Sequence, residues 1–230
     1  MPAISEQPTR RERLREQTSR EIMSIALRQL VADGAGGISL RGIAREMGMT
    51  ARAIYTYFAT RDELITALTD EMTTSLADSL ERARDTAPDD PGARLIAWGS
   101  ALREWALANP EGFRLIYGDP IPGYEQPVDG PTDRAARRIC GGLNSLVAEV
   151  NPAGRPGAEW SDFPVDYVTK IRTEAPDITP ETAGLALCVW GRIHGLVTLE
   201  IYGHLRSVSN DPAALQRADL LELVQQLRAS

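Results

Sequence analysis

The residues best suited to binding chemistry lie between positions 39 and 61 of the 230-residue chain. Hydroxyl, phenol and guanidinium groups recur there at close spacing, which suits contacts to phosphate oxygens and to base edges in DNA. Arg52 is the best candidate for a bidentate contact to guanine in the major groove. Thr50 can donate to a phosphate beside the backbone N–H groups at the start of a helix. The predicted DNA-binding residues are Ser39, Arg41, Thr50, Arg52, Tyr55, Thr56, Tyr57 and Arg61.

Two short helices joined by a tight turn must present these side chains, and residues 40–58 meet the steric requirements of that motif. Ala44 supplies the small residue where the second helix crosses the first. Gly48 supplies a turn residue that tolerates a positive φ, and Ile54 follows as the inward apolar anchor. We therefore predict a helix-turn-helix. The alternative is a helical hairpin that matches the pattern by coincidence.

The remaining chain reads as helix-period segments of Ala, Leu, Arg and Glu between Gly and Pro clusters, which predicts an all-α protein. Ser39, Thr50 and Thr60 are the predicted caps of the second, third and fourth helices. The loop at 118–131 is either packed structure beside a site or a flexible surface excursion. Helices are expected near 11–33, 41–47, 50–58, 61–86, 92–108, 110–117, 132–150, 161–174, 180–206 and 211–228.

Charge is distributed unevenly along the chain. Residues 1–60 contain nine arginines and six acidic residues, a net charge of +3, although the whole chain has a net charge of −7. A basic segment on an acidic protein indicates a local site for a polyanion, and the alternative is a solvated charged face. Because +3 is modest, we expect limited unspecific affinity for DNA.

The segment GMTARAIYTYFATRDEL (48–64) resembles the signature of the TetR family of transcription regulators, and the match extends over roughly residues 15–70. Met47 stands where that family often has alanine. Arg61 stands where lysine is usual and keeps the charge that can approach a phosphate. The stretches at 109–124 and 190–205 resemble the subfamily whose C-terminal domain is named for a Trp-His-Gly motif, here Trp190, His194 and Gly195.

The resemblance implies an N-terminal three-helix DNA-binding domain at 1–60 and a C-terminal helical domain for ligand binding and dimerisation at 61–230. The helix near 61–86 would connect the two. The implied partners are double-stranded DNA with a palindromic operator, an unidentified small molecule, and a second copy bound through the last two helices. The geometry of DNA supports dimerisation, since paired half-sites about 34–36 Å apart require two-fold symmetry.

The residues themselves support the dimer only partly. The 180–206 helix is apolar nearly all round, and the last helix has Leu220, Val224 and Leu227 on one face. Core packing within one protomer would give the same pattern.

Aromatic residues of the C-terminal part are the candidates for the ligand pocket. Plain core filling is the alternative for each of them. His194 is either a buried histidine satisfied by a hydrogen bond or a ligand contact. The predicted pocket residues are Trp98, Trp105, Phe113, Tyr117, Trp190 and His194.

We expect neither an enzyme nor a bound cofactor. The sequence contains no Gly-rich phosphate loop, no nucleophile elbow and no metal-ligand spacing. His194 and His204 are the two histidines, ten residues apart, so no metal site is predicted. Cys140 and Cys188 are isolated in apolar contexts and are expected to be reduced core thiols.

The chain is expected to be cytoplasmic. Residues 1–17 lack the apolar region of a secretory signal. The most apolar stretch, 185–202, carries Arg192 and Glu200, which excludes an ordinary membrane span.

The predicted function is that of a repressor that a small molecule releases from DNA. The alternative is a constitutive regulator or architectural protein that binds DNA without a ligand.

Overall fold

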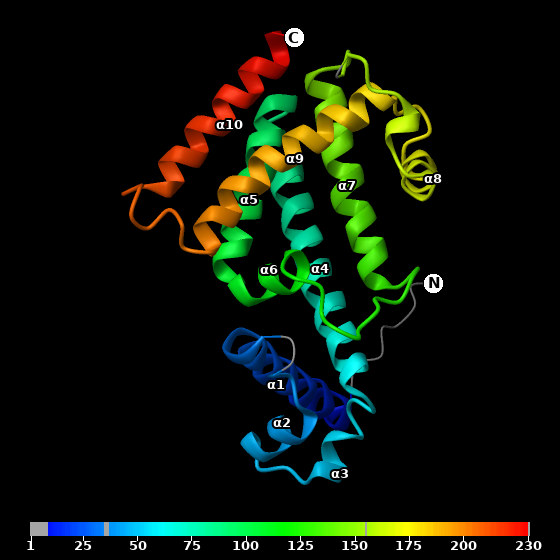
Figure 1. The fold of residues 1–230 in the computed structure, drawn as a ribbon, viewed down its shortest axis with the longest axis vertical. Coiled ribbons are helices and arrows are strands. Elements are labelled where there is room, and N and C mark those ends of the chain that lie inside the picture. The colour runs from blue at the N-terminus through cyan, green and yellow to red at the C-terminus, as the bar shows by residue number, and fades with distance from the viewer. Residues whose placement is uncertain (1–8, 35–36, 155, 230) are drawn as a thin grey trace. The chain divides into compact units, whose positions relative to one another are not determined.

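The computed structural model describes residues 9–34, 37–154 and 156–229, and every regular element within these ranges is a helix (Figure 1). The predicted all-α fold is confirmed. The α-helices are α1 (Arg10–Asp33), α2 (Leu40–Glu46), α3 (Ala51–Ile54), α4 (Arg61–Thr86), α5 (Pro91–Ala108), α6 (Pro110–Tyr117), α7 (Pro131–Val150), α8 (Val165–Glu174), α9 (Pro180–Ile201) and α10 (Pro212–Ala229).

The described residues form two compact units. The first lies within Met1–Thr69 and Glu111–Pro127, and the second within Asp70–Pro110 and Val128–Ser230. The helix-turn-helix belongs to the first unit, and the last two helices belong to the second. The boundary predicted near residue 60 between the DNA-binding and ligand-binding domains stays a prediction. A division into compact units need not coincide with a division into functional domains.

Helices α2, α3 and α4 begin at the side-chain caps that the sequence predicts. Ser39 and Thr50 each accept a hydrogen bond from the backbone N–H three residues later, at 3.2 Å. Thr60 accepts from the N–H of Glu63 at 3.1 Å. These bonds satisfy N–H groups that the first turn of a helix leaves without partners, so the three predicted caps are confirmed.

The third helix is shorter than predicted: it covers Ala51–Ile54 rather than 50–58. Beyond it, the N–H groups of Thr56 and Tyr57 bond to the carbonyls three residues back, at 3.1 and 2.9 Å. This tighter turn follows from the run of aromatic and β-branched residues, which lose side-chain freedom in an α-helix. The turn leads to Phe58, which is buried in the core of the first unit.

The first part of the proline-rich loop is packed rather than a flexible excursion. Ile121 and Tyr124 lie against the buried core of the first unit. The hydroxyl of Tyr124 lies 2.9 Å from that of Thr66 and donates to Gln126 at 2.8 Å. These contacts attach residues 118–127 to α4.

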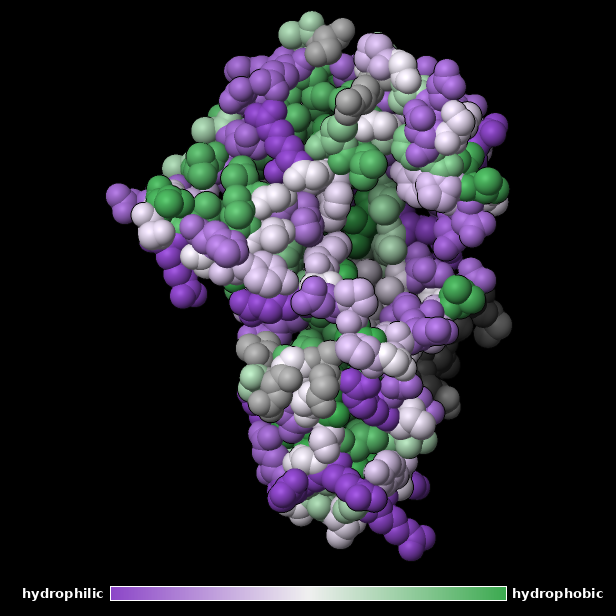
Figure 2. All heavy atoms as spheres, in the orientation of Figure 1, coloured by the Kyte–Doolittle hydropathy of each residue, from purple (hydrophilic) through white to green (hydrophobic). Residues whose placement is uncertain are grey.

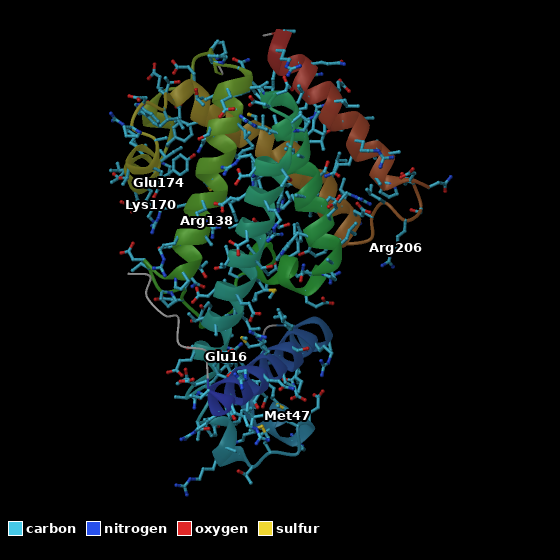
Figure 3. All side chains as sticks on the ribbon, turned by 180° about the vertical axis from the view of Figure 1, so that it is seen from behind. Glu16, Met47, Arg138, Lys170, Glu174 and Arg206 are labelled. Carbon is cyan, nitrogen blue, oxygen red and sulfur yellow. The ribbon has the colours of Figure 1, made fainter. Side chains whose placement is uncertain are left out.

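Helices α5, α7, α9 and α10 pack together around the core of the second unit. Ion pairs join them: the guanidinium of Arg103 on α5 binds Glu200 on α9 through two bonds of 2.7 Å. Arg192 on α9 binds Asp219 on α10 at 2.8 Å. Arg138, labelled in Figure 3 on α7, donates to Glu81 of α4 at 2.8 Å.

Two further helices differ from their predicted bounds. The segment predicted at 161–174 forms a short 3₁₀ helix at Trp160–Asp162 and an α-helix only from Val165, because Pro164 lacks an N–H and cannot continue a helix that starts before it. The helix predicted at 180–206 ends at Ile201. Gly203 has a φ of +80°, the left-handed conformation that commonly ends a helix.

Helix α9 is long and apolar enough to cross a bilayer by length and composition alone. Within the second unit it packs against α5, α7 and α10, and 39% of its most apolar 18-residue stretch is buried. The prediction that Cys140 and Cys188 are core thiols is wrong, since both are exposed. Apolar residues on α7 and α9 extend beyond the face that each helix buries, so an apolar context did not indicate burial at these two positions.

Candidate nucleic-acid interface

The turn between α2 and α3 has the geometry that the motif requires. Gly48 has a φ of +65°, which a residue with a side chain rarely adopts. The N–H of Met49 then bonds back to the carbonyl of Ala44 at 2.8 Å. Ala44 and Ile54 are both buried, as expected of the crossing residue and the inward anchor. A helix-turn-helix is therefore present, and the coincidental hairpin is excluded.

Six of the predicted DNA-binding residues are exposed in the first unit. Ser39 and Arg41 lie at the start of α2, and the other four lie on α3 or beside it. The hydroxyl oxygen of Thr50 accepts from the backbone, so its hydrogen can point outward toward a phosphate. The exposed residues are Ser39, Arg41, Thr50, Arg52, Tyr55 and Thr56.

The other two predicted residues are less accessible. Tyr57 is half-buried and packs against the core of the first unit. Tyr57 therefore offers less surface to DNA than the exposed residues do. The side chain of Arg61 is 31% exposed and lies 3.7 Å from Asp62 at the start of α4.

Arg15, which lies on α1 outside the motif, was not among the predicted residues. Its Nη2 donates to the carbonyl of Thr56 at 2.9 Å, and its guanidinium carbon lies 5.3 Å from the centre of the Tyr57 ring. A cation over a tyrosine face is attractive, so Arg15 holds the turn that follows α3. No local pattern could reveal this contact, because it joins residues 41 positions apart.

Three of the predicted pocket residues meet in the second unit. The rings of Trp98 and Trp190 pack edge to face with centroids 6.0 Å apart, and His194 lies 4.9 Å from Trp190. The Nδ1 of His194 lies 3.1 Å from the hydroxyl of Thr198. Burial lowers the pKa of His194 below its ordinary value, so the imidazole is neutral at pH 7.

The other three predicted pocket residues lie elsewhere. Trp105 is buried in the second unit and donates from Nε1 to Ser75 at 3.0 Å. Phe113 and Tyr117 belong to the first unit, where their ring centroids are 5.1 Å apart. The structure therefore divides the predicted pocket residues among three places.

A polar hollow of about 580 Å³ lies along α4 in the second unit. Trp105, one of the predicted pocket residues, lines this hollow, but most of the lining comes from one polar face of α4. The sequence signal for this face is the spacing of its polar residues at three and four positions. The lining residues are Asp70, Glu71, Thr74, Ser75, Asp78, Ser79, Arg82, Trp105 and Pro131.

The residues that the structure describes contain no group of three His, Cys, Asp or Glu side chains that could hold a metal ion. Two of the carboxylates that line the hollow have other partners. Asp70 accepts from the backbone N–H of Thr132 at 2.8 Å, and Asp78 lies 2.6 Å from Arg138.

Two family patterns match the chain. Residues 22–68 match the family described as bacterial regulatory proteins, tetR family. Residues 95–223 match the tetracyclin repressor-like C-terminal domain. The narrower Trp-His-Gly subfamily stays a prediction.

Similar proteins include transcription regulators. HTH-type transcriptional regulator Rv1816 of Mycobacterium tuberculosis is 36% identical over 200 residues, which cover 82% of this chain and 82% of that protein. The solved structure of regulatory protein SCO4313 is 37% identical with a TM-score of 0.75, covering 94% of this chain and all of that one. The fatty acid degradation regulator FadR from Bacillus halodurans shares the fold at 16% identity, with a TM-score of 0.61 over 91% of this chain and 99% of that one.

Proposed function

Because the chain belongs to the TetR family of bacterial regulatory proteins, we propose that this transcriptional regulator is a repressor released from its operator by a small molecule. The helix-turn-helix carries the proposal, because Gly48 makes its tight turn with a positive φ and most of the residues assigned to DNA contact on and beside α3 are exposed. Arg52 is the base-reading residue, and Thr50, Tyr55, Tyr57 and Arg61 position the helix on phosphates.

The operator-binding form is a homodimer that uses α9 and α10. Helix α9 buries one face, which includes Ile193 and Val197, yet its opposite face carries the exposed residues Leu187 and Leu199. No neighbouring atom lies within 4 Å of the place where a side chain would start at Gly191 on that opposite face. A second helix can therefore approach closely there.

Helix α10 extends the same apolar surface. Leu215 and Leu221 on α10 are exposed, and Figure 2 shows hydrophobic residues among hydrophilic ones over α9 and α10. Apolar area of this kind on a soluble protein favours a partner surface.

Selection of duplexes from a random-sequence library by the full-length protein tests the operator proposal. We expect enrichment of a palindrome whose half-site centres are about 34–36 Å apart, because a two-fold dimer places two recognition helices in successive major grooves. Sedimentation of the complex should give two chains per duplex. Failure to enrich any sequence, or enrichment of a single asymmetric site by one chain, would contradict the proposal.

The ligand binds in the second unit. Two places there are candidates: the aromatic group of Trp98, Trp190 and His194, and the polar hollow beside Trp105. Binding at either place releases DNA only if the ligand prefers the conformation that does not fit the operator, and the effect is limited by that preference.

A thermal-shift screen of small molecules tests the ligand half of the proposal. A ligand at about 100 times its Kd should stabilise the protein by about 2.7 kcal/mol and raise the Tm. The same compound should also lower the affinity of the protein for the selected duplex. A compound that raises the Tm without changing DNA affinity serves as the control. If no compound does both, the constitutive regulator is favoured. The constitutive regulator is supported by the burial of Trp98, which is only 1% exposed and can simply pack in the core.

We also propose that the protein acts in the cytoplasm, where bacterial DNA lies, and that it has no catalytic activity.

A further inference from the structure

We propose that the first turns of α1 form a second DNA contact, in which Arg11 binds a backbone phosphate beside the groove that α3 enters. This inference rests on the proposed operator binding. It extends the DNA-binding surface to a part of the chain outside the helix-turn-helix.

The start of α1 lies beside the turn that follows α3. Arg15 donates to the carbonyl of Thr56 at 2.9 Å and lies over the ring of Tyr57. In Figure 1, the dark-blue beginning of α1 lies on the side of α3. The face of α1 that bears Arg15 is therefore continuous with the predicted DNA-binding residues.

Arg11 lies on this same face. It precedes Arg15 by four residues, so the two side chains are neighbours on the helix surface, and four residues advance a helix by about 6 Å. Farther along α1 the same stripe buries Ile22 and Ala26 in the core of the first unit. At the start of the helix the stripe extends past that core, and Arg11 is exposed there.

The positive charge at the start of α1 is not compensated within the described part of the chain. Cations near a helix N-terminus interact unfavourably with the helix dipole, so Arg11 is in a costly place unless an anion meets it. The nearby acids are engaged elsewhere: Glu12 accepts from the N–H of Thr9 at 2.7 Å. Glu16, labelled in Figure 3, lies 4.0 Å from Arg20. Among the residues that the structure describes, Arg11 has no ion pair or hydrogen bond through its side chain.

A phosphate backbone suits this surface better than base edges do. The arginines are exposed at the end of a helix that lies beside the recognition turn rather than in it, and phosphates flank every groove at regular spacing. A phosphate contact releases counterions, so it leaves a measurable trace in the salt dependence of binding.

The test measures binding of the full-length protein to its selected duplex from 0.05 to 0.2 M salt. Each lost phosphate contact should reduce the slope of log K against log salt by about 0.9, and a dimer loses two in Arg11→Ala. The loss of affinity over this salt range should therefore be roughly twelvefold smaller than for the wild type. The preference among single-base variants of the duplex should not change, and neither should the Tm.

Arg20→Ala is the matched control, because Arg20 is exposed on the opposite side of α1 and the charge change is identical. We expect its slope to equal that of the wild type. An unchanged slope in Arg11→Ala, equal decreases in both variants, or a lost preference at one base pair would each overturn the phosphate contact. A wild-type protein that selects no duplex would instead contradict the proposed function, and the inference with it.

Discussion

Replacing Arg52 with alanine should weaken binding to the selected operator roughly thirtyfold to twenty-thousandfold. A bidentate contact between arginine and guanine contributes about 1–3 kcal/mol of discrimination, and a dimer loses two such contacts, or about 2–6 kcal/mol. Arg52 is exposed on α3, so the fold should not change. The measurement is a titration of labelled duplex at fixed salt, with the Tm of the variant as the check on folding.

Arg52→Lys separates base reading from electrostatic attraction. Lysine keeps the charge but cannot supply the planar pair of donors that matches guanine. A base contact predicts that Arg52→Lys loses most of the affinity and also the preference at one position of each half-site. Near wild-type affinity in Arg52→Lys would assign Arg52 to a phosphate instead, and unchanged affinity in Arg52→Ala would remove it from the interface.

Replacing Trp98 with alanine should destabilise the protein by about 3–5 kcal/mol. Trp98 is 1% exposed and meets the ring of Trp190 edge to face, so truncation removes a large apolar surface and leaves a cavity. Urea unfolding at constant protein concentration measures the loss, since dimerisation makes stability depend on concentration.

Two further variants test whether the loss of stability is specific to the buried ring of Trp98. Trp98→Phe keeps an aromatic ring and should be less destabilising than Trp98→Ala. Trp160→Ala removes a tryptophan that is only half-buried, on a short 3₁₀ turn, and should also have the smaller effect. If Trp98→Ala unfolds like the wild type but no longer responds to a ligand found by thermal shift, Trp98 lines an open pocket rather than filling the core.

Much of the first unit could be predicted because its determinants are close in sequence. A cap needs an oxygen within three residues of the N–H groups it accepts from, and Ser39, Thr50 and Thr60 supply it. The motif turn needs a positive φ, and Gly48 adopts it. The early end of α3 has an equally local cause, because the aromatic and β-branched residues at 55–58 disfavour an α-helix.

The positions of the predicted pocket residues depend on packing between distant parts of the chain. Aromatic residues at helical spacing indicate a buried face, but they do not say which helix that face meets. Trp98 and Trp190 are far apart in the chain, and their contact depends on how α5 packs against α9. Phe113 gave the same sequence signal, yet it lies in the other unit.

The helix-turn-helix and the all-helical fold follow from local sequence, because capping, turn conformation and periodicity are set by neighbours within a few residues. What joins the motif to the rest of the first unit depends on packing between distant residues. Arg15 lies over Tyr57 because α1 packs across the unit, and helix periodicity defines a face without defining its partner. The proposed DNA-contacting surface therefore has one part that local sequence indicates, within residues 39–61, and another, at the start of α1, whose position depends on packing.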